Sequence, residues 1–242
     1  MKSLDRAAIT TVVRHGETSI RIGPWSDFPG VAQLVALPSS RPTEADAIAA
    51  ALETATRLGF SHVRTGALGP GEIAPYTAHG FEVEATLVLL RHGLRDLVPH
   101  RESLRRARRG DWSSLAAIDD AAFPPYWHFD ERSLREAQGA TPSSRTRVAG
   151  GRSPIGYAIT GRTGSTGFVQ RLAVHPSATG RGIGRALTLD GLHWLRRRGS
   201  KQAFVNTQDD NERALALYLD LGFLAEPQPL LVLARTAGGA RQ

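Results

Sequence analysis

Hydrophobic and polar positions along the chain follow two periodicities. Short β-branched or apolar runs, typical of strands, occur at residues 7–13, 18–22, 31–37, 61–65, 81–90, 104–108, 146–149, 155–160, 167–174, 202–206 and 230–234. Longer stretches with helical spacing occur at 44–58, 112–122, 130–138, 183–198 and 210–221, with a short one at 72–79. Strands and helices therefore share one chain, and the pattern predicts an α/β (α+β) fold with helices flanking a mixed sheet.

Helix boundaries are marked by capping residues. We expect side chains to cap helix starts at Thr43, Asp111, Asp130 and either Asp209 or Asp210, and glycines to end helices at Gly59 and Gly199. Residues 91–103 are charged and contain Gly93 and Pro99, so they resemble a boundary between two parts of the chain.

One stretch combines a strand, a glycine loop and a helix start. The apolar run Leu172-Ala173-Val174 stops before Pro176, and Thr179-Gly180-Arg181-Gly182-Ile183-Gly184-Arg185 leads into a helix. The first amides of a helix have no intrahelical partner, and glycine lets an anion approach the backbone closely. The loop is therefore interpreted as a cradle for a diphosphate.

Two common phosphate motifs do not fit this loop. A P-loop needs Lys and then Ser or Thr after its last glycine, and here Arg185-Ala186 follows Gly184. The dinucleotide fingerprint would need glycine where Leu187 or Arg185 stands. A nucleoside triphosphatase and a Rossmann-type dehydrogenase are both disfavoured.

Composition limits the remaining classes. The 242 residues carry a formal net charge of +7 and include no cysteine, which excludes disulfides and a cysteine nucleophile. The N-terminus has no apolar segment of the secretory kind, so we expect a cytoplasmic protein. The positive charge suits an anionic cofactor or substrate, and nucleic acid is a less favoured partner.

The glycine loop resembles the coenzyme-A loop of the GCN5-related N-acetyltransferases (the GNAT family), whose pattern is Gln/Arg-x-x-Gly-x-Gly/Ala. Gly182-Ile183-Gly184 supplies the glycine part, and Thr179 stands where the family has Gln or Arg. The element order from about residue 102 to residue 236 is also that of the family. The resemblance implies the GNAT fold, with a mixed and mostly antiparallel central sheet, and acetyl-CoA as the cofactor.

The resemblance also implies roles for particular residues. Backbone groups of Leu172, Ala173 and Val174 are expected to hold the pantetheine arm where this strand splays from residues 202–206, and residues 179–185 are expected to hold the diphosphate. The run from Asn211 to Phe223 resembles the second family signature. Asn211 is expected to contact the coenzyme, and Tyr218 is the expected acid for the departing thiolate, with a core aromatic role as its alternative.

The acceptor side is less defined. Residues 123–129 are the densest aromatic cluster, and we expect Phe123, Tyr126 and Trp127 to line the acceptor pocket, or else to plug the core beneath the helices. No general base stands out, because Gln170 and Arg171 occupy the strand where the family often carries Glu. Asp119, Asp120 and His128 are each expected to be a cap, surface or packing residue. The reaction itself requires no metal.

The two halves of the chain resemble each other in order and spacing. Val35-Ala36-Leu37-Pro38-Ser39 parallels Ala173-Val174-His175-Pro176-Ser177, and Tyr76 parallels Tyr218. The first half lacks the glycines, since Glu44 and Asp46 stand in place of Gly182 and Gly184. We predict a degenerate, truncated GNAT-like domain at 1–98, a catalytic domain at 99–236 and a disordered tail at 237–242.

The sequence thus predicts a tandem protein that transfers acetyl from acetyl-CoA to a primary amine by direct attack. The acceptor is left open among a protein N-terminus, a lysine and a small amine, and oligomeric state is not predicted. Tandem organisation also resembles mycothiol synthase, which the chain length and truncated first half fit poorly. The alternative function is a non-catalytic acyl-CoA-binding regulator whose basic surface docks nucleic acid, motivated by Thr179 and the missing Glu.

Overall fold

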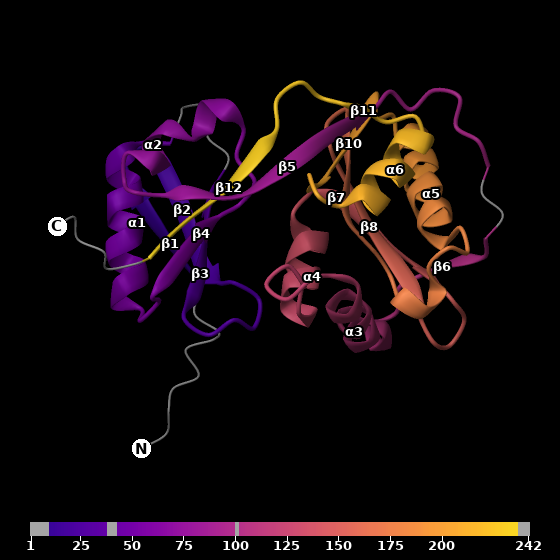
Figure 1. Cartoon of the computed structure of the whole chain (residues 1–242), viewed down its shortest axis with the longest axis horizontal. Helices are drawn as coiled ribbons and strands as arrows, with labels where there is room; N and C mark the ends of the chain where they lie inside the picture. Colours follow the sequence, from indigo (N-terminus) through magenta and orange to yellow (C-terminus); the bar gives the residue numbers. More distant parts are fainter. Residues whose placement is uncertain (1–9, 38–42, 100–101, 237–242) are drawn as a thin grey trace, which may run out of the picture. The chain divides into compact units, whose positions relative to one another are not determined.

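The computed structural model describes residues 10–37, 43–99 and 102–236, and the chain forms two compact units (Figure 1). The first unit contains the described residues up to Val88 and those from Pro227 onward, and the second runs from Leu89 to Glu226. The expected boundary between residues 98 and 99 differs from this division. The last strand, expected in the catalytic domain, belongs to the first unit because it pairs there. The predicted tail at 237–242 lies outside the described residues.

The first unit is built on a sheet with the strand order β1-β2-β3-β4-β12-β5. Its strands are β1 (Thr11–His15), β2 (Thr18–Pro24), β3 (Val31–Ala36), β4 (His62–Thr65), β5 (Glu82–His92) and β12 (Leu230–Thr236), and its helices are α1 (Ala45–Arg57), α2 (Ala74–Thr77) and the 3-10 turn η2 (Pro70–Glu72). β3 and β4 are parallel, whereas the other pairs of neighbours are antiparallel.

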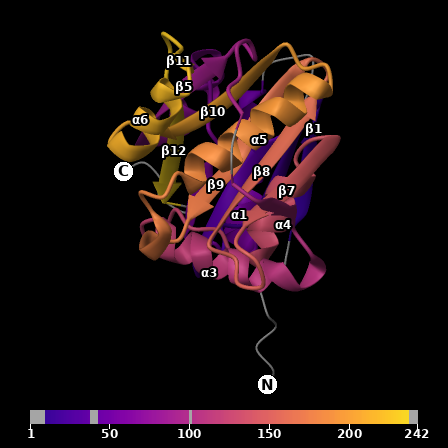
Figure 2. The ribbon, with the colours of Figure 1, turned by 90° about the vertical axis from the view of Figure 1, so that its right-hand side faces the viewer.

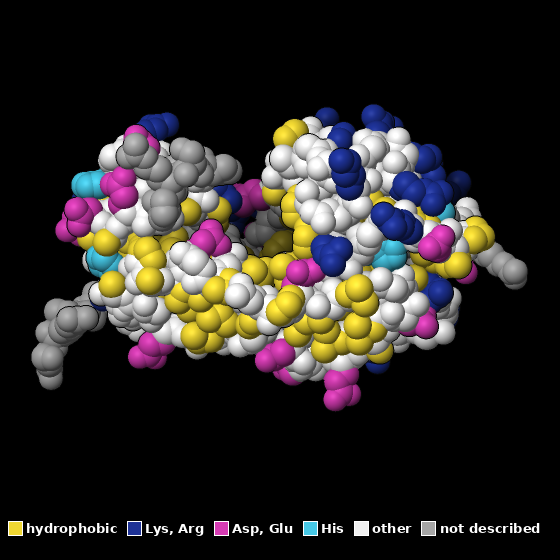
Figure 3. Space-filling view, turned by 90° about the horizontal axis from the view of Figure 1, so that it is seen from above, with side chains coloured by type: hydrophobic (Ala, Val, Ile, Leu, Met, Phe, Trp, Pro, Cys, Tyr) yellow, Lys and Arg dark blue, Asp and Glu magenta, His cyan; other side chains and the backbone are white. Residues whose placement is uncertain are grey.

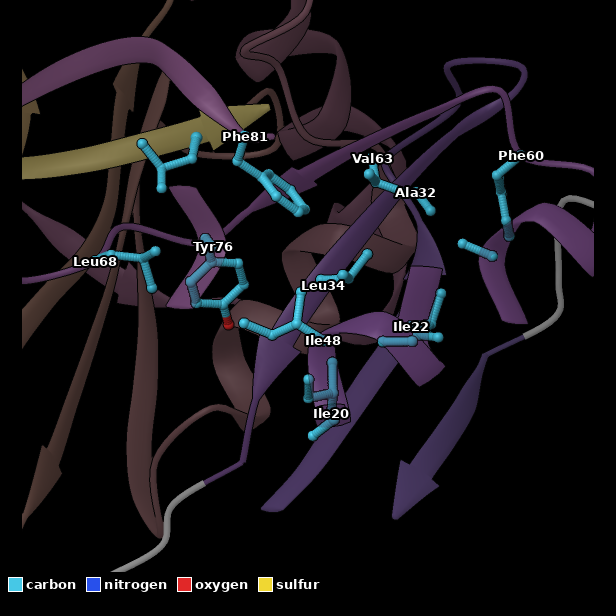
Figure 4. Close-up of a cluster of buried hydrophobic side chains, with 14 residues drawn as sticks. Ile20, Ile22, Ala32, Leu34, Ile48, Phe60, Val63, Leu68, Tyr76 and Phe81 are labelled. Carbon is cyan, nitrogen blue, oxygen red and sulfur yellow. The ribbon is translucent and has the colours of Figure 1, made fainter. Parts of the chain in front are cut away.

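The core of the first unit lies between α1 and the sheet. Alternate residues of β2 and β3, such as Ile20, Ile22 and Leu34, point toward Ile48 of α1 and are almost fully buried (Figure 4). The aromatic rings of Tyr76 and Phe81 meet edge to face at 5.4 Å between centroids in the same cluster. Alternation of apolar and polar residues in the strands therefore fixes which face α1 covers.

The second unit has the strand order β6-β7-β8-β9-β10-β5, with β11 pairing the end of β5. Its further elements are β6 (Leu104–Arg106), the 3-10 turn η3 (Arg109–Asp111), α3 (Trp112–Ala122), α4 (Glu131–Gly139), β7 (Ser143–Ala149), β8 (Gly156–Thr163), β9 (Thr166–Val174), the turn η4 (Pro176–Ala178), α5 (Ile183–Arg197), β10 (Gln202–Gln208), α6 (Glu212–Asp220) and β11 (Leu224–Ala225). β6 to β9 form an antiparallel meander, and β9 pairs β10 in parallel. The mixed, mostly antiparallel sheet that was predicted is confirmed.

Helices cover both faces of this sheet. On one face, α3 and α4 pack on side chains such as Val148, Tyr157 and Ile159. On the other face, Ile183 and Leu187 of α5 pack on Ala158 and on residues at the end of β9. Figure 2 shows α5 running along β8 and β9. Successive strand residues thus point to opposite layers, and the end of β9 lies beside the start of α5.

Each unit completes its sheet with a strand from a distant part of the sequence. β5 begins in the first unit, beside β12, and its end at Leu90 and Arg91 pairs with β11 in the second unit. β12 follows the second unit in sequence yet pairs with β4 and β5 of the first. Chain order alone does not reveal this exchange, which is why the C-terminal strand was assigned to the wrong unit.

Several expected caps differ in the structure. Asp130 does cap α4, accepting a hydrogen bond from the amide of Ser133 at 2.7 Å. Asp111 precedes α3 but makes no capping bond to it, since its side chain accepts from the amide of Arg108 in η3 and pairs with Arg105. α6 is capped by Asn211 instead of an aspartate before it. Glu44, not Thr43, is the residue before α1, and its side chain makes no capping bond. Among the described residues, no helix is long and apolar enough to cross a membrane.

Candidate active site

The glycine loop lies between the end of β9 and the start of α5. Gly180 and Gly182 have φ angles of +77° and +76°, which non-glycine residues rarely adopt. A Cβ atom added to either glycine would meet nothing within 4 Å, so the space in front of both is open. Gly182 is the residue before α5, and it directs the first turn of that helix toward this space.

The amides of this loop are unused. No amide from Gly180 to Arg185 donates a hydrogen bond to any part of the chain that the structure describes, and the first helical bond is from Ala186 to Gly182 at 2.9 Å. Six successive donors at the positive end of a 15-residue helix form an anion-binding surface. The open space in front of Gly180 and Gly182 leaves room for an anion such as a diphosphate to approach these amides.

Charged and polar side chains around the loop are partly engaged. Arg181 is exposed and donates to the carbonyl of Ser177 at 3.0 Å, and Arg185 pairs with Asp220 of α6. Thr179 donates from its hydroxyl to the carbonyl of Pro176 at 2.9 Å. Thr179 thus closes the η4 turn, a local role that a long Gln or Arg would not perform in the same way.

The parallel strands β9 and β10 separate toward the loop. Their pairing covers three positions and ends at Phe168 opposite Phe204, although β9 continues to Val174 and β10 to Gln208. Within the described residues, the edge of β9 that faces β10 therefore has no ladder partner beyond Phe168. An extended ligand with amide groups can occupy such an opening as an added strand.

The expected strand residues face different layers beside this opening. Leu172 and Val174 pack with Ile183 in the α5 layer, whereas Ala173 belongs to the α3 and α4 layer. Their side chains are engaged in packing, so a contribution to ligand binding comes from their backbone. Gly184 lies close to α6, since an added Cβ would be 3.3 Å from Leu217.

Helix α6 carries the second group of expected residues. Tyr218 is 5% exposed, and its ring lies 5.4 Å from that of Phe223. Within the described residues its hydroxyl has no hydrogen-bond partner. Burial raises the pKa of Tyr218 well above its usual range, against a smaller lowering by the charge of Arg171. The hydroxyl therefore stays protonated at neutral pH.

Asn211 has a structural role at the start of α6. Its side-chain oxygen accepts from the amide of Ala214 at 3.1 Å. The side-chain NH₂ group is not used in that bond and remains a possible donor to a ligand. The ion pair between Arg185 and Asp220 then joins the other end of α6 to the glycine loop.

A buried ionic cluster lies on the opposite face of β9. Arg171 donates from Nε and Nη2 to the two oxygens of Asp119 at 2.8 and 2.6 Å, and Asp119 is fully buried. The hydroxyl of Tyr157 and the amide of Phe129 also donate to Asp119. Burial acts to lower the pKa of Arg171, but its bonds to Asp119 and that charge raise it overall. Both carboxylate oxygens are thus engaged, which removes Asp119 as a general base.

The aromatic segment 123–129 is organised around the same arginine. The guanidinium carbon of Arg171 lies 3.5 Å from the ring centroid of Phe123 and 3.9 Å from that of Phe129. Arg171 also donates to the carbonyl of Trp127 at 2.8 Å, and Tyr126 has a positive φ of 78°. Phe123 and Phe129 pack against the core, so the plug interpretation holds for them. Tyr126 and Trp127 are half-buried and remain candidates for a pocket wall.

Sequence reasoning missed the role of Arg171. Asp119 and Tyr157 are 52 and 14 positions from it, and no local spacing joins them. The available signal was a single charged residue, Arg171, in a strand whose other residues are uncharged, because a buried charge requires a partner. Asp120, by contrast, is 73% exposed, with His128 Nδ1 3.6 Å from its carboxylate, as expected for a surface residue.

Comparisons with known proteins fit this geometry. Residues 110–223 match the model of the acetyltransferase (GNAT) family. The mycothiol acetyltransferase of Saccharomonospora viridis is 30% identical over 237 residues, which cover 90% of this chain and 65% of that protein. That of a Nocardioides species is 28% identical over 183 residues, which cover 64% and 62%. The chain spans less than two thirds of the length of these two relatives.

Among solved structures, a tandem GNAT protein from the clavulanic acid biosynthesis pathway superposes with a TM-score of 0.67. The match covers 94% of this chain and 82% of that chain at 16% identity. At 16% sequence identity, this similarity is evidence for a shared fold and not for a shared function. Together with the family match, it shows that the chain has the GNAT fold that the sequence predicted.

Proposed function

We propose that this chain, which has the fold of the GNAT acetyltransferases, transfers an acetyl group from acetyl-CoA to a primary amine. The observation that carries the proposal is the glycine loop, with six free amides, two glycines at positive φ and open space in front of them. The match of residues 110–223 to the family supports it.

The loop residues from Thr179 to Arg185 would hold the diphosphate of the coenzyme, chiefly through backbone amides. The unpaired edge of β9 at Leu172, Ala173 and Val174 would hold the pantetheine amides. Asn211 would add its side-chain NH₂ group, which the cap leaves unused. Acetyl-CoA supplies the thioester carbonyl that the amine attacks.

Tyr218 is proposed as the acid of the reaction. Its hydroxyl is protonated at neutral pH and free of partners within the described chain, so it can donate a proton to the departing sulfur. The ion pair between Arg185 and Asp220 links α6 to the loop, and we assign it the role of keeping Tyr218 near the coenzyme. Tyr76 takes the corresponding place in the sequence of the first unit, where Glu44 and Asp46 stand in place of Gly182 and Gly184.

No carboxylate is assigned as the base. The carboxylate of Asp119 already accepts hydrogen bonds from Arg171, Tyr157 and Phe129. Arg171 itself lies in the strand where the resembled family often carries Glu. We propose that the amine binds unprotonated or loses its proton to water. An acceptor amine of low pKa suits such a site, because little free energy is then needed to deprotonate it.

For the acceptor we propose a small amine, and specifically the non-acetylated precursor of mycothiol as the first to test. The support is that both relatives described above are named mycothiol acetyltransferase. On sequence alone, the chain length and the truncated first half fit an enzyme of mycothiol synthesis poorly. The half-buried Tyr126 and Trp127 would form one wall of the acceptor pocket.

The test is acetylation of an amine panel, with product masses measured after incubation with acetyl-CoA. The panel contains the mycothiol precursor, an aminoglycoside, a lysine peptide and a peptide with a free N-terminus. An acetylated product that depends on Tyr218 supports the proposal, and the preferred amine identifies the acceptor class. The matched control is Tyr76→Phe, which should leave the rate unchanged.

A second candidate is a non-catalytic acyl-CoA-binding regulator. The observation that favours it is the engagement of Asp119, which leaves the β9 face without a free carboxylate at that position. Binding of acetyl-CoA without acetylation of any amine in the panel, together with salt-sensitive binding of duplex DNA, would favour the regulator.

A further inference from the structure

A second cluster of cations lies in the second unit, away from the glycine loop. A cavity of about 240 Å³ is lined by Arg106, Ser143, Ser144, Arg145, Arg147, Trp194 and Arg198. Lys and Arg side chains gather on the surface of this unit, at the right of Figure 3. Four guanidinium groups and two hydroxyls therefore meet in a space large enough for a small anion.

The fold brings these arginines together. Ser143, Arg145 and Arg147 alternate along β7 and share one face, and Arg106 of β6 stands opposite Arg147 in the antiparallel register. Trp194 and Arg198 are one turn apart near the C-terminal end of α5, which packs on this side of the sheet. The cavity is thus separated from the glycine loop by most of the length of α5.

Ion pairing within the chain uses only part of this charge. Asp190 pairs with Arg145, and its carboxylate lies 3.3 Å from Nε of Arg147. The Nε group of Arg145 is buried without a hydrogen-bond partner. Arg106 and Arg198 are exposed, and their guanidinium groups have no partner among the residues described.

The neighbouring cations disfavour the charged form of Arg145. Burial, together with the charges of Arg147, Arg197 and Arg106, lowers the pKa of Arg145 to about 10 against the attraction of Asp190. The negative end of a helix dipole explains cations such as Arg196 and Arg197 in the last turn of α5. The dipole of α5 does not explain Arg106, Arg145 and Arg147, because these residues lie on strands β6 and β7.

We propose that this cavity, which we call the β7 pocket, binds a small molecule carrying a phosphoryl group. Guanidinium forks and serine hydroxyls are suited to tetrahedral oxyanions, and Nε of Arg145 offers a buried donor that lacks an acceptor. An anion there would also offset the repulsion among Arg106, Arg145 and Arg147. The proposal stands on this pocket alone and does not depend on acetyl transfer.

The volume of the β7 pocket limits the size of the anion that it can bind. About 240 Å³ accommodates a phosphate, a pyrophosphate or a sugar phosphate, whereas a nucleic acid duplex would contact only the rim. Arg145 is the innermost cation, with 13% of its side chain exposed, so a ligand must enter the pocket to reach it. Recognition of a discrete phosphoryl group is therefore favoured over a flat electrostatic contact.

Calorimetric titration of the full chain with inorganic phosphate, pyrophosphate and glucose 6-phosphate tests this proposal and distinguishes free phosphate from a phosphorylated metabolite. Arg106→Gln and Arg198→Gln remove exposed donors without touching the Arg145–Asp190 pair. Each should weaken binding about tenfold, as expected for the loss of one charge-assisted hydrogen bond. The matched control Arg196→Gln removes a neighbouring exposed arginine outside the pocket and should have little effect.

Four results would overturn the proposal. No heat with any of the three anions would do so, as would equal weakening by Arg196→Gln and Arg198→Gln, which would indicate diffuse charge. Loss of binding in Arg181→Gln alone would assign the anion to the glycine loop. Tighter binding of duplex DNA than of pyrophosphate, lost in the same pocket variants, would identify a nucleic-acid surface instead.

Discussion

The two units contain the same local arrangement, a strand followed by a helix, with opposite chemistry at the helix start. At α5, Gly180 and Gly182 leave open space and free amides. At α1, the preceding residue is Glu44, whose carboxylate lies so close to Gly16 that an added Cβ there would be 2.6 Å from it. The amide of Glu44 is already used, since it donates to the hydroxyl of Thr18 at 3.1 Å.

The two units also differ in how far their parallel strands pair with each other. In the second unit β9 and β10 pair over three positions and then separate. In the first unit β3 and β4 pair at all four positions of β4, from Val31 opposite His62 to Leu34 opposite Thr65. β4 ends with its last pair, so these two strands do not continue side by side without pairing as β9 and β10 do. The helix start in the second unit therefore has the features of a candidate coenzyme site, and the helix start in the first unit has an acid and a used amide instead.

The largest expected effect comes from making α5 resemble α1. Gly182→Glu places a carboxylate at the start of α5 and forces a side chain onto a φ of +76°. Repulsion of the coenzyme phosphates should weaken acetyl-CoA binding about 1,000-fold, because like charges in contact cost several kcal/mol. Calorimetry measures the affinity, and circular dichroism checks the fold.

The matched variant is Glu44→Gln, which should leave acetyl-CoA affinity unchanged. If Glu44→Gln altered affinity as much as Gly182→Glu, the contrast between the two helix starts would be wrong.

Loss of the charge on Asp119 should give the next largest effect, on stability. Asp119→Asn leaves the buried Arg171 without its counter-ion, and the free energy of unfolding should fall by about 3 to 4 kcal/mol. Urea unfolding measures the change. Asp120→Asn, one position away and exposed, should change stability by less than about 0.5 kcal/mol. Equal effects of the two variants would show that the buried cluster does not stabilise the second unit.

Removal of one hydroxyl sharpens the comparison of the two tyrosines. Tyr218→Phe should lower kcat about 100-fold, the usual contribution of a general acid, with little change in acetyl-CoA affinity. Burial also raises the pKa of Tyr76, to about 12, but Tyr76→Phe should leave kcat unchanged. Steady-state kinetics with the preferred amine distinguish these outcomes, and an unchanged kcat for Tyr218→Phe would rule out its role as the acid.

The smallest expected effect concerns pH and the end of β5. Burial lowers the pKa of His92, whose Nδ1 accepts from the amide of Leu94 at 2.8 Å. Below about pH 6.5 the unfolded chain binds a proton that the folded chain resists, so acidification should reduce stability. His92→Asn keeps an acceptor for Leu94 and should reduce the fall in thermal midpoint between pH 7 and pH 5.5. An unchanged pH dependence in this variant would contradict the assignment.

The features that sequence predicted are those encoded locally. The glycine loop, the helix after it and the meander before it follow from residue types at short spacing, and the bounds agree within a few residues. The exchange of β5 and β12 was missed, because strand pairing between distant segments leaves no local pattern. The cap of α6 was misplaced by one or two positions, because Asp209, Asp210 and Asn211 are all capping residue types and it is Asn211 that accepts the bond from Ala214.

The candidate site was predictable to a similar degree. Its backbone part, from Thr179 to Arg185, could be read from the sequence because glycines report backbone geometry directly. The part made of side chains could not, since Arg171 meets Asp119 across 52 positions and the aromatic rings only through the fold. Thr179, which departs from the family pattern, gained a role from one local hydrogen bond to Pro176.

The central claim is that the chain has one coenzyme site and that it lies at the α5 loop. Calorimetric titration of the full chain with acetyl-CoA tests this most directly, because it reports affinity and stoichiometry together. The expected result is one molecule bound per chain, with binding lost in Gly182→Glu and retained in Glu44→Gln. Two molecules per chain, or binding that survives Gly182→Glu, would contradict it.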